Sequence, residues 1–207
     1  MTPTQPLIHV VDDDASFRTA VTRLLRAAKY EVRGYATASE FLDSRPCTAP
    51  GCILLDLRMP GLSGFDLQQS LAQMDEPLPV IFLSGHGDIP ASVRAMKAGA
   101  ADFLTKPVRR DALLRAIQNA LERDATEREA RTTVRELRSR YETLTARERE
   151  VLAHVVGGKL NKQIAFDLGT SERTIKAHRA SIMRKLRVQS AAELGRLAQE
   201  LGIQPIR

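Results

Sequence analysis

The first part of the chain alternates short apolar runs with segments in which apolar residues recur at helical spacing. The run Leu7–Val11 is followed by a stretch in which Phe17, Val21 and Leu25 lie four positions apart. Similar runs near 30–35, 52–55, 80–83 and 102–104 are each followed by a helical pattern. Unbroken apolar runs are typical of strands that are buried on both faces. The pattern predicts an α/β domain, a five-stranded parallel sheet covered by helices.

Beyond Leu144 the alternation stops, and the pattern predicts helices alone. Thr145, with Glu148 three residues later, forms a capping box that opens the first of these helices. Glycines separate the first helix from the second and the second from the third. The four helices are predicted to begin at Thr145, Asn161, Ser171 and Ser190. This part of the chain is predicted to be all-α, with a tight turn between its second and third helices.

Between these parts, residues 123–140 are rich in Arg, Glu, Ala and Thr and contain neither Gly nor Pro. This segment can continue the preceding helix. The 3-4-3 spacing of Val134, Leu137, Tyr141 and Leu144 permits a coiled-coil dimer stalk, but it covers fewer than the three or four heptads that such a stalk requires. We favour a solvated helical linker. The predicted organisation is an α/β domain over 1–123, a linker over 124–140 and a helical domain over 141–207.

The charges of the chain are distributed unevenly. The net charge of +6 over 207 residues is by itself a weak indication of a nucleic-acid or membrane partner. Residues 1–123 carry 14 basic and 14 acidic side chains, whereas residues 124–207 carry 17 basic and 11 acidic ones. The whole excess therefore lies in the linker and the helical domain, which favours nucleic acid as the partner of that half.

The cysteines and the terminus favour a cytoplasmic protein. Cys47 and Cys52 are too few for a disulfide framework, and Cys52 is interpreted as a small buried hydrophobe. No apolar stretch approaches the roughly 20 residues that span a bilayer. The N-terminal residues lack the basic and apolar regions of a signal peptide. We therefore expect a cytoplasmic location and no membrane partner.

Chemically useful side chains follow the predicted strands. Asp12 and Asp13 follow the first strand, Asp56 the third, Ser84 the fourth and Lys106 the fifth. The carboxyl ends of parallel strands share one edge, so these groups are expected to converge there. The clustered carboxylates favour a hard ion such as Mg²⁺, for which Asp12 and Asp13 are suited. Asp56 can act as a nucleophile toward phosphorus. The hydroxyl of Ser84 and the ammonium of Lys106 can stabilise the phosphoryl oxygens. Any one of these residues alone would be interpreted as a loop charge.

These residues lie in segments that resemble a two-component response-regulator receiver domain over residues 1–123. The segments are Val11–Asp14, Asp56–Gly61, Ser84–Asp88 and Lys106-Pro107. The resemblance implies a flavodoxin-like sheet of order 2-1-3-4-5. It also implies phosphorylation of Asp56 by a sensor histidine kinase and Mg²⁺ bound by Asp12, Asp13, Asp56 and the backbone carbonyl of Arg58. Ser84, Lys106 and Phe103 would stabilise the phosphoryl group and act as the switch, and Pro107 would follow a cis peptide.

The predicted third helix of the second half is strongly basic. Residues 173–187 contain six Lys and Arg residues and no acid. A basic helix after a short helix and a tight turn fits a helix-turn-helix whose second helix enters the DNA major groove. A solvated basic face is the plainer interpretation, but this is the one helix that the motif would insert. Candidate DNA contacts among the basic residues of the two motif helices are Lys162, Arg173, Lys176, Arg179, Arg184 and Lys185.

The second half resembles the LuxR-type helix-turn-helix over residues 141–207. The matching segments are Leu144–Leu152, Asn161–Ala165, Thr174–Arg179 and Lys185–Val188. Both halves together resemble the FixJ/NarL class of response regulators, closest to its FixJ and styrene-regulator branch. The chain departs from the nitrate-type regulators at Ala180, where those proteins carry lysine, so base preference does not transfer. The resemblance implies that Thr174, Lys176, Ala177 and Arg179 face DNA. It also implies promoter binding as a homodimer formed on phosphorylation, with RNA polymerase as a further partner and activation as the outcome.

Two other functions are compatible with parts of this pattern. A Mg²⁺-dependent phosphatase of the haloacid-dehalogenase type would also use an aspartyl-phosphate, but it places a second acid where this chain has Arg58. Alternatively, the first domain serves only as a dimer scaffold for a DNA-binding module that ignores phosphorylation. We favour a transcription regulator with no enzymatic activity beyond Mg²⁺-dependent self-phosphorylation at Asp56 and slow autodephosphorylation.

Overall fold

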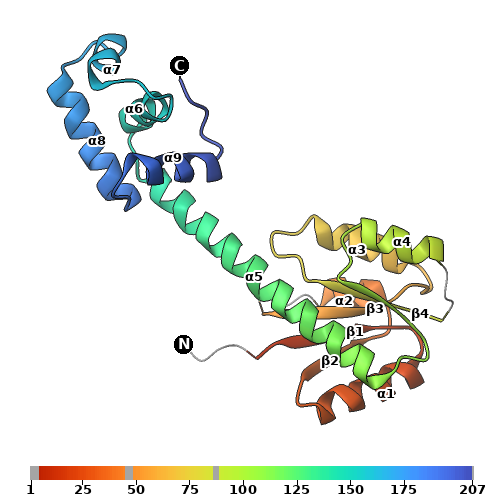
Figure 1. Ribbon diagram of the computed structural model, residues 1–207. Coiled ribbons are helices and arrows are strands. Elements are labelled where there is room, and N and C mark those ends of the chain that lie inside the picture. The colour runs from red at the N-terminus through yellow and green to blue at the C-terminus, as the bar shows by residue number, and fades with distance from the viewer. Residues whose placement is uncertain (1–4, 45–48, 86–88, 207) are drawn as a thin grey trace. The chain divides into compact units, whose positions relative to one another are not determined.

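The computed structural model describes residues 5–44, 49–85 and 89–206. The chain divides into two compact units, Met1–Arg128 and Glu129–Arg207. The first is an α/β unit and the second is helical (Figure 1). Cys47 and residues 86–88, which belong to a segment that carries the receiver resemblance, lie outside the described residues.

The α/β unit is built on a five-stranded sheet. The strands are β1 (Leu7–Val11), β2 (Glu31–Tyr35), β3 (Gly51–Asp56), β4 (Val80–Ser84) and β5 (Asp102–Thr105). All neighbouring pairs are parallel, and the order is β2-β1-β3-β4-β5. This confirms the predicted order. Strands β1, β3 and β4 are buried at every position, as unbroken apolar runs require.

Helices cover both faces of this sheet (Figure 1). They are α1 (Ala15–Ala27), α2 (Ala38–Asp43), α3 (Gly64–Ala72), α4 (Ile89–Lys97) and α5 (Arg110–Glu142). One core lies between the sheet and the pair α1 and α5, and includes Leu25 and Ile117. A second core lies on the other face under α2, α3 and α4, and includes Phe41 and Leu67. The site at the strand ends is therefore held by two separately packed layers.

Local capping fixes where the helices beside the site begin. Asp14 is the N-cap of α1, and its side chain accepts hydrogen bonds from the amides of Ser16 and Phe17. Ser63 and Asp66 form a capping box at the start of α3. Side-chain oxygens satisfy the amides that the first helical turn leaves unpaired. The chain therefore turns sharply after β1 and after the β3 loop, which keeps both strand ends open.

Helix α5 continues without interruption from the α/β unit into the helical unit. Gly and Pro are absent over 123–140, as noted above, so nothing in the sequence ends the helix. Near its end, Leu137 and Tyr141 pack against the core of the helical unit, together with buried Leu144. The last part of the apolar stripe in the linker thus has a partner within the same chain.

The helical unit contains four further helices. They are α6 (Ala146–Val156), α7 (Asn161–Asp167), α8 (Glu172–Leu186) and α9 (Ala191–Glu200). Thr145, Ser171 and Ser190 are the N-caps of α6, α8 and α9, as the sequence predicts. Buried Val151, Ile175 and other apolar residues of all four helices form one core.

Candidate functional site

Three carboxylates meet at the carboxyl edge of the sheet. Val11 of β1 pairs with Leu55 of β3, so Asp12 and Asp56, one residue further on, lie side by side. Oxygen atoms of Asp12, Asp13 and Asp56 all lie within 4.8 Å of one another. Asp12 and Asp56 are buried, whereas Asp13 is exposed. The sequence places these residues at strand ends, and the register of the sheet brings them together.

Lys106 joins this group from the end of β5. Its ammonium lies 2.6 Å from an oxygen of Asp12 and 3.1 Å from an oxygen of Asp56. The amide of Lys106 donates to the carbonyl of Ser84, which fixes the strand end beside the carboxylates. The ring of Phe17 lies beneath the ammonium, with 4.1 Å between the nitrogen and the ring centroid. One cation therefore holds two buried acids that would otherwise repel each other.

Burial and charge act against each other at this site. Burial raises the pKa of Asp56, whereas the charge and hydrogen bond of Lys106 lower it. The carboxylates of Asp12 and Asp13 raise it further, so the pKa of Asp56 lies above its usual value. For Lys106, burial lowers the pKa, but the hydrogen bond and charge of Asp12 together with those of Asp56 outweigh burial and raise it. The ammonium therefore stays charged in the presence of the acids.

The donor set fits a hard divalent cation. All three side chains offer oxygen atoms, close enough for one ion to be shared among them. Mg²⁺ prefers one or two carboxylates together with water and phosphate oxygens. Arg58, whose backbone carbonyl the resemblance assigns to the metal, lies two residues after Asp56 with an exposed side chain.

The two predicted switch residues lie on neighbouring strands. Ser84 is buried at the end of β4 and pairs in register with Thr105 of β5. Phe103 pairs with Phe82, and their ring centroids are 6.3 Å apart. Phe103 is only partly buried, two residues along its strand from the partner of Ser84. The Lys106–Pro107 peptide is cis.

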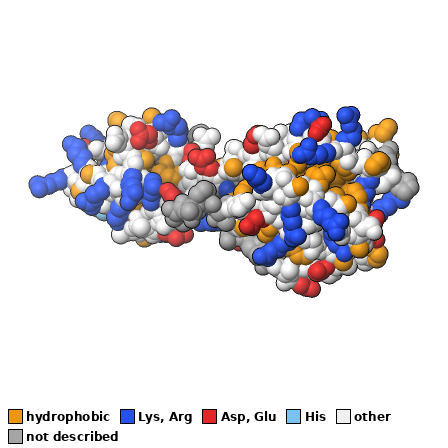
Figure 2. Space-filling model, turned by 90° about the horizontal axis from the view of Figure 1, so that it is seen from below, with side chains coloured by type: hydrophobic (Ala, Val, Ile, Leu, Met, Phe, Trp, Pro, Cys, Tyr) orange, Lys and Arg blue, Asp and Glu red, His pale blue; other side chains and the backbone are white. Residues whose placement is uncertain are grey.

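The candidate DNA contacts cluster on α8 of the helical unit. Figure 2 shows Lys and Arg side chains spread over the visible face of this unit. Arg173, Thr174, Lys176, Ala177 and Arg184 are exposed on α8. Lys162 is exposed on α7, the helix that precedes it. Most of the predicted set is thus available to a ligand.

Two members of the set are engaged within the unit. The guanidinium of Arg179 donates to the side-chain oxygen of Asn161 at 3.0 Å, which joins the start of α7 to α8. The ammonium of Lys185 lies 2.6 Å from Glu148 and also donates to the carbonyl of Thr143. The Arg179 contact joins the two helices of the motif, whereas the Lys185 contacts join α8 to α6 and to the segment before α6.

Comparison with known families decides the class of the protein. The chain matches the response regulator receiver domain over residues 8–118 and the bacterial regulatory proteins of the luxR family over residues 142–198. This chain is a response regulator. The two matches fall on the α/β unit and on the helical unit, so the fold and the family agree.

Relatives match this chain along most of its length. The regulator is 46% identical over 200 residues to nodulation protein W of Bradyrhizobium diazoefficiens, covering 97% of this chain and 88% of the relative. It is 40% identical over 198 residues to the transcriptional regulatory protein FixJ of Azorhizobium caulinodans, covering 96% and 94%. The solved structure of the response regulator StyR is 46% identical and has a TM-score of 0.81, covering 95% and 99%. The regulator is therefore a transcription factor of two-component systems, with a receiver domain and a LuxR-type DNA-binding domain.

Sequence reasoning missed several residues that the fold brings to these sites. The ring of Phe17 under Lys106 was interpreted only as part of a helical apolar stripe. Asn161 was interpreted as a helix start, and its contact with Arg179 spans 18 residues. No local pattern could signal either contact, because each joins segments that are far apart in the sequence.

Across the described residues, no helix is long and apolar enough to cross a membrane.

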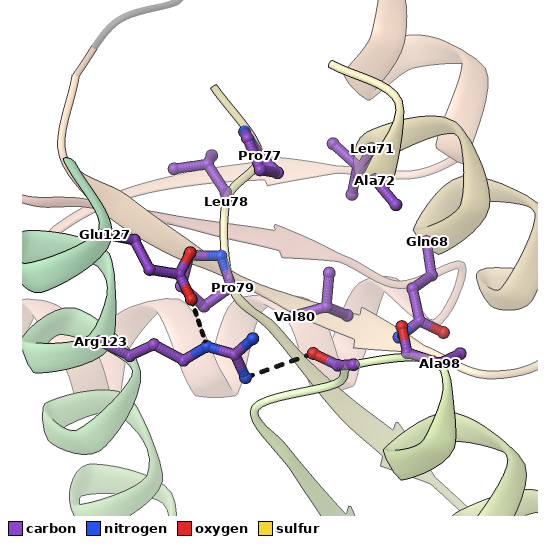
Figure 3. A pocket seen from close by; sticks show the side chains of 11 residues that line it. Gln68, Leu71, Ala72, Pro77, Leu78, Pro79, Val80, Ala98, Arg123 and Glu127 are labelled. Carbon is purple, nitrogen blue, oxygen red and sulfur yellow. Dashed lines mark hydrogen bonds and ion pairs between the residues drawn. The ribbon is translucent and has the colours of Figure 1, made fainter. Parts of the chain in front are cut away.

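A separate hollow lies at the opposite edge of the sheet (Figure 3). It has a volume of about 200 Å³ and lies between the ends of α3 and α4, the start of β4, and α5. Arg123 borders it, paired with Glu127 at 2.7 Å and donating to the carbonyl of Gly99. None of the predicted site residues lines it. It is therefore distinct from the carboxylate cluster.

Proposed function

We propose that Asp56 is the phospho-acceptor of the regulator and that a sensor histidine kinase is its donor. The observation that carries this proposal is the pairing of Lys106 with both Asp12 and Asp56 at one strand edge. An oxygen of Asp56 forms the new bond to phosphorus as the bond from phosphorus to the imidazole nitrogen of the donor breaks, and that nitrogen keeps the electron pair. Self-phosphorylation from a small phosphate donor, and slow hydrolysis of the product, would use the same residues.

Asp12, Asp13 and Asp56, with the backbone carbonyl of Arg58, would hold Mg²⁺ beside the acceptor. When bound, the ion neutralises charge on the transferring phosphoryl group. Lys106 lies close enough to move from the Asp56 carboxylate to a phosphoryl oxygen on the same side chain. Because Lys106 also contacts Asp12, it stays at the site while its partner changes.

The proposed switch is the repacking of Ser84 and Phe103. Ser84 is buried beside the acceptor strand, and Phe103 is partly exposed on the adjacent strand. A phosphoryl group that attracts the hydroxyl of Ser84 would leave room for the ring to turn inward. The phosphoryl group then shifts an existing equilibrium by a few kcal/mol, which changes the surface formed by α4 and β5.

The output proposed for this switch is promoter binding by a homodimer in the cytoplasm, with activation through RNA polymerase. In this division of labour, residues 1–123 receive the phosphoryl group, 124–140 form the linker and 141–207 bind DNA. Arg173, Thr174, Lys176, Ala177 and Arg184 are the exposed reading and phosphate-contacting residues of α8. Lys162 adds a phosphate contact from α7. Arg179 and Lys185 would reach DNA from positions that also brace the motif.

Labelling tests the acceptor directly. The full chain is incubated with acetyl phosphate and Mg²⁺, and its intact mass is measured. We expect the addition of one phosphoryl group in the wild type and none in Asp56→Asn, while Asp66→Asn, which changes an exposed capping acid, labels normally. A labelled Asp56→Asn protein would overturn the assignment. Turnover of small phosphate esters would instead indicate a phosphatase.

A further inference from the structure

The ring of Phe17 is a neighbour of the Lys106 ammonium that carries no charge. The ammonium nitrogen lies 4.1 Å from the ring centroid, well inside the roughly 6 Å over which a cation is attracted to an aromatic face. The same ammonium lies 2.6 Å from an oxygen of Asp12 and 3.1 Å from an oxygen of Asp56. Lys106 is therefore held by two anions and by one neutral ring.

Phe17 is fixed in this position by the start of α1. Its backbone amide donates to the side chain of Asp14, the N-cap of the helix, at 3.1 Å. Its side chain is partly buried and packs against the core between the sheet and the pair α1 and α5. Lys106 reaches the ring from the end of β5, with its side chain 19% exposed. The ring therefore covers one side of the ammonium at the edge where the carboxylates meet.

The two anionic partners of Lys106 attract it less strongly when they share a divalent cation. Oxygens of Asp12, Asp13 and Asp56 all lie within 4.8 Å of one another, and this donor set fits Mg²⁺. A carboxylate that binds such an ion offers less negative charge to the ammonium, and two cations at one edge repel each other. The attraction of the aromatic face does not depend on the charge of the carboxylates. The ring therefore matters most when the metal site is filled.

We propose that Phe17 is a positioning residue that keeps the Lys106 ammonium at the carboxylate edge when Mg²⁺ is bound. The inference rests on the proposed function, because the ammonium is needed there for phosphoryl transfer to Asp56. The bond from Asp56 to phosphorus forms as the bond to the leaving group of the donor breaks, and that group keeps the electron pair. Held beside the acceptor, Lys106 stabilises the negative charge of the phosphoryl oxygens during this exchange.

This role predicts two effects of opposite sign. The ring favours the position in which the ammonium repels a bound cation, so a weaker ring should strengthen Mg²⁺ binding, since such couplings are reciprocal. The same weakening should slow phosphorylation, because Lys106 lies beside the acceptor in fewer molecules. Damage to a ring that only supports the fold would instead weaken Mg²⁺ binding and slow phosphorylation together. The sign of the change in Mg²⁺ affinity therefore separates positioning from packing.

The test replaces Phe17 in the full chain by phenylalanine analogues with one, two or three ring fluorines. Fluorine withdraws electron density from the ring face, so the attraction for a cation falls stepwise while the side chain stays apolar and close to its original shape. The matched control is the same series at Phe65, whose ring centroid lies 4.2 Å from the guanidinium carbon of a different cation, Arg94. We measure Mg²⁺ affinity by calorimetry, the rate of phosphorylation by acetyl phosphate at saturating Mg²⁺, and thermal unfolding.

We expect the trifluorinated Phe17 variant to bind Mg²⁺ about threefold more tightly and to be phosphorylated about fivefold more slowly than the wild type, with intermediate values for one and two fluorines. The unfolding temperature should not change, and the Phe65 series should match the wild type throughout. Affinities and rates that do not depend on the number of fluorines at Phe17 overturn the inference. Weaker Mg²⁺ binding with a lower unfolding temperature overturns it in favour of a packing role.

A second measurement separates this inference from the proposed function. Nuclei that lie over an aromatic ring are shifted upfield, so the NMR signals of the Lys106 side chain, assigned with Lys106→Arg, report the contact without any phosphoryl transfer. We expect the upfield shift to persist in the wild type when Mg²⁺ is added and to decrease in the trifluorinated Phe17 variant. A wild-type shift that disappears with Mg²⁺ overturns the inference even if Asp56 is phosphorylated. A shift that persists in a chain that acetyl phosphate does not label supports the inference and counts against the proposed function alone.

Discussion

At the scale of single residues, Lys106 decides whether three acids can share one strand edge. Its ammonium contacts both buried carboxylates and rests on the ring of Phe17. The carboxylates of Asp12 and Asp56 would otherwise face each other in a region with little water. The same cation is in position to stabilise an incoming phosphoryl group. Holding the acids and the proposed stabilisation of the phosphorylated product would have one geometric origin.

Replacing Lys106 by methionine tests this role. The variant keeps the length of the side chain but removes the charge, so we expect phosphorylation of the full chain by acetyl phosphate to slow by about 100-fold. The rate is followed by intact mass over time. Lys97→Met, which removes an exposed lysine at the end of α4, should react at the wild-type rate. Equal rates for both variants would contradict the role of Lys106.

Glu148 plays a comparable part in the helical unit. Burial alone would raise its pKa, but hydrogen bonds from Lys185, from Thr145 and from Ser181 lower the pKa from 4.5 to about 2. The carboxylate closes the capping box of α6 and binds two residues of α8. A depressed pKa in the folded state means that this stabilisation is present above pH 4.5 and is lost as the pH falls toward 2.

Glu148→Gln should therefore destabilise the helical unit in a pH-dependent way. At pH 7 we expect a loss of about 2 kcal/mol in the free energy of unfolding, because charged hydrogen bonds are replaced by weaker ones. Below pH 4.5 the difference between variant and wild type should shrink. Denaturant titrations at several pH values measure this. Glu150→Gln, which removes an exposed ion pair with Arg147, should change stability little at any pH.

At the scale of elements, the end of α5 within the first unit is clamped to the sheet. Buried Asp124 accepts hydrogen bonds from the amide of Gly51 at 3.0 Å and from Arg128 at 2.8 Å. The guanidinium of Arg128 also reaches Glu76 at 3.2 Å and the carbonyl of Ala49 at 2.9 Å. Three separate segments thus meet at the last helical turn of the first unit. The clamp fixes the point at which α5 leaves the receiver domain.

Arg128→Ala should loosen this turn. It removes the guanidinium that contacts Asp124, Glu76 and the carbonyl of Ala49, so we expect a loss of about 2 kcal/mol in the stability of the receiver domain. Amide protons of residues 124–128 should also exchange faster with solvent. Urea unfolding and hydrogen exchange on the full chain measure the two effects. Arg138→Ala, on an exposed part of the same helix, is the matched control and should change neither.

At the scale of the whole molecule, the excess positive charge and the proposed phosphorylation site lie in different units. Residues 1–123 are neutral, and the basic excess of the chain lies after them. Affinity for DNA depends mainly on that excess, because phosphate contacts supply most of the binding free energy. The proposed control by the receiver domain would therefore act mainly through the arrangement or pairing of the basic units.

Phosphorylation should accordingly raise DNA affinity through dimerisation. At fixed salt, we expect the phosphorylated full chain to bind a selected DNA fragment about tenfold more tightly or more, with a shift from monomer to dimer, because two linked contacts act together. Fluorescence anisotropy and light scattering measure affinity and mass. Asp56→Asn treated in the same way should show neither change. An unchanged affinity and mass in the wild type would favour a phosphorylation-independent scaffold.

Several features that are carried by neighbours along the chain could be predicted from the sequence. The capping box at Thr145, the helix start at Ser190 and the strand ends at Asp12 and Asp56 each follow from a local pattern. The buried runs predicted a parallel sheet, whereas the strand order β2-β1-β3-β4-β5 was predicted by the resemblance to a known family. Local backbone preference and hydrophobic periodicity are properties of short segments, and a single sequence displays them directly.

Which distant side chains meet depends on the tertiary structure. The ring of Phe17 under Lys106, the pairing of Lys185 with Glu148 and the clamp around Arg128 join residues that are tens of positions apart. Lys185 shows the consequence most clearly, since the sequence indicates a cation for DNA and the fold gives that cation a buried carboxylate partner. Such pairings depend on how whole helices and strands pack, and no periodicity along the chain records the packing.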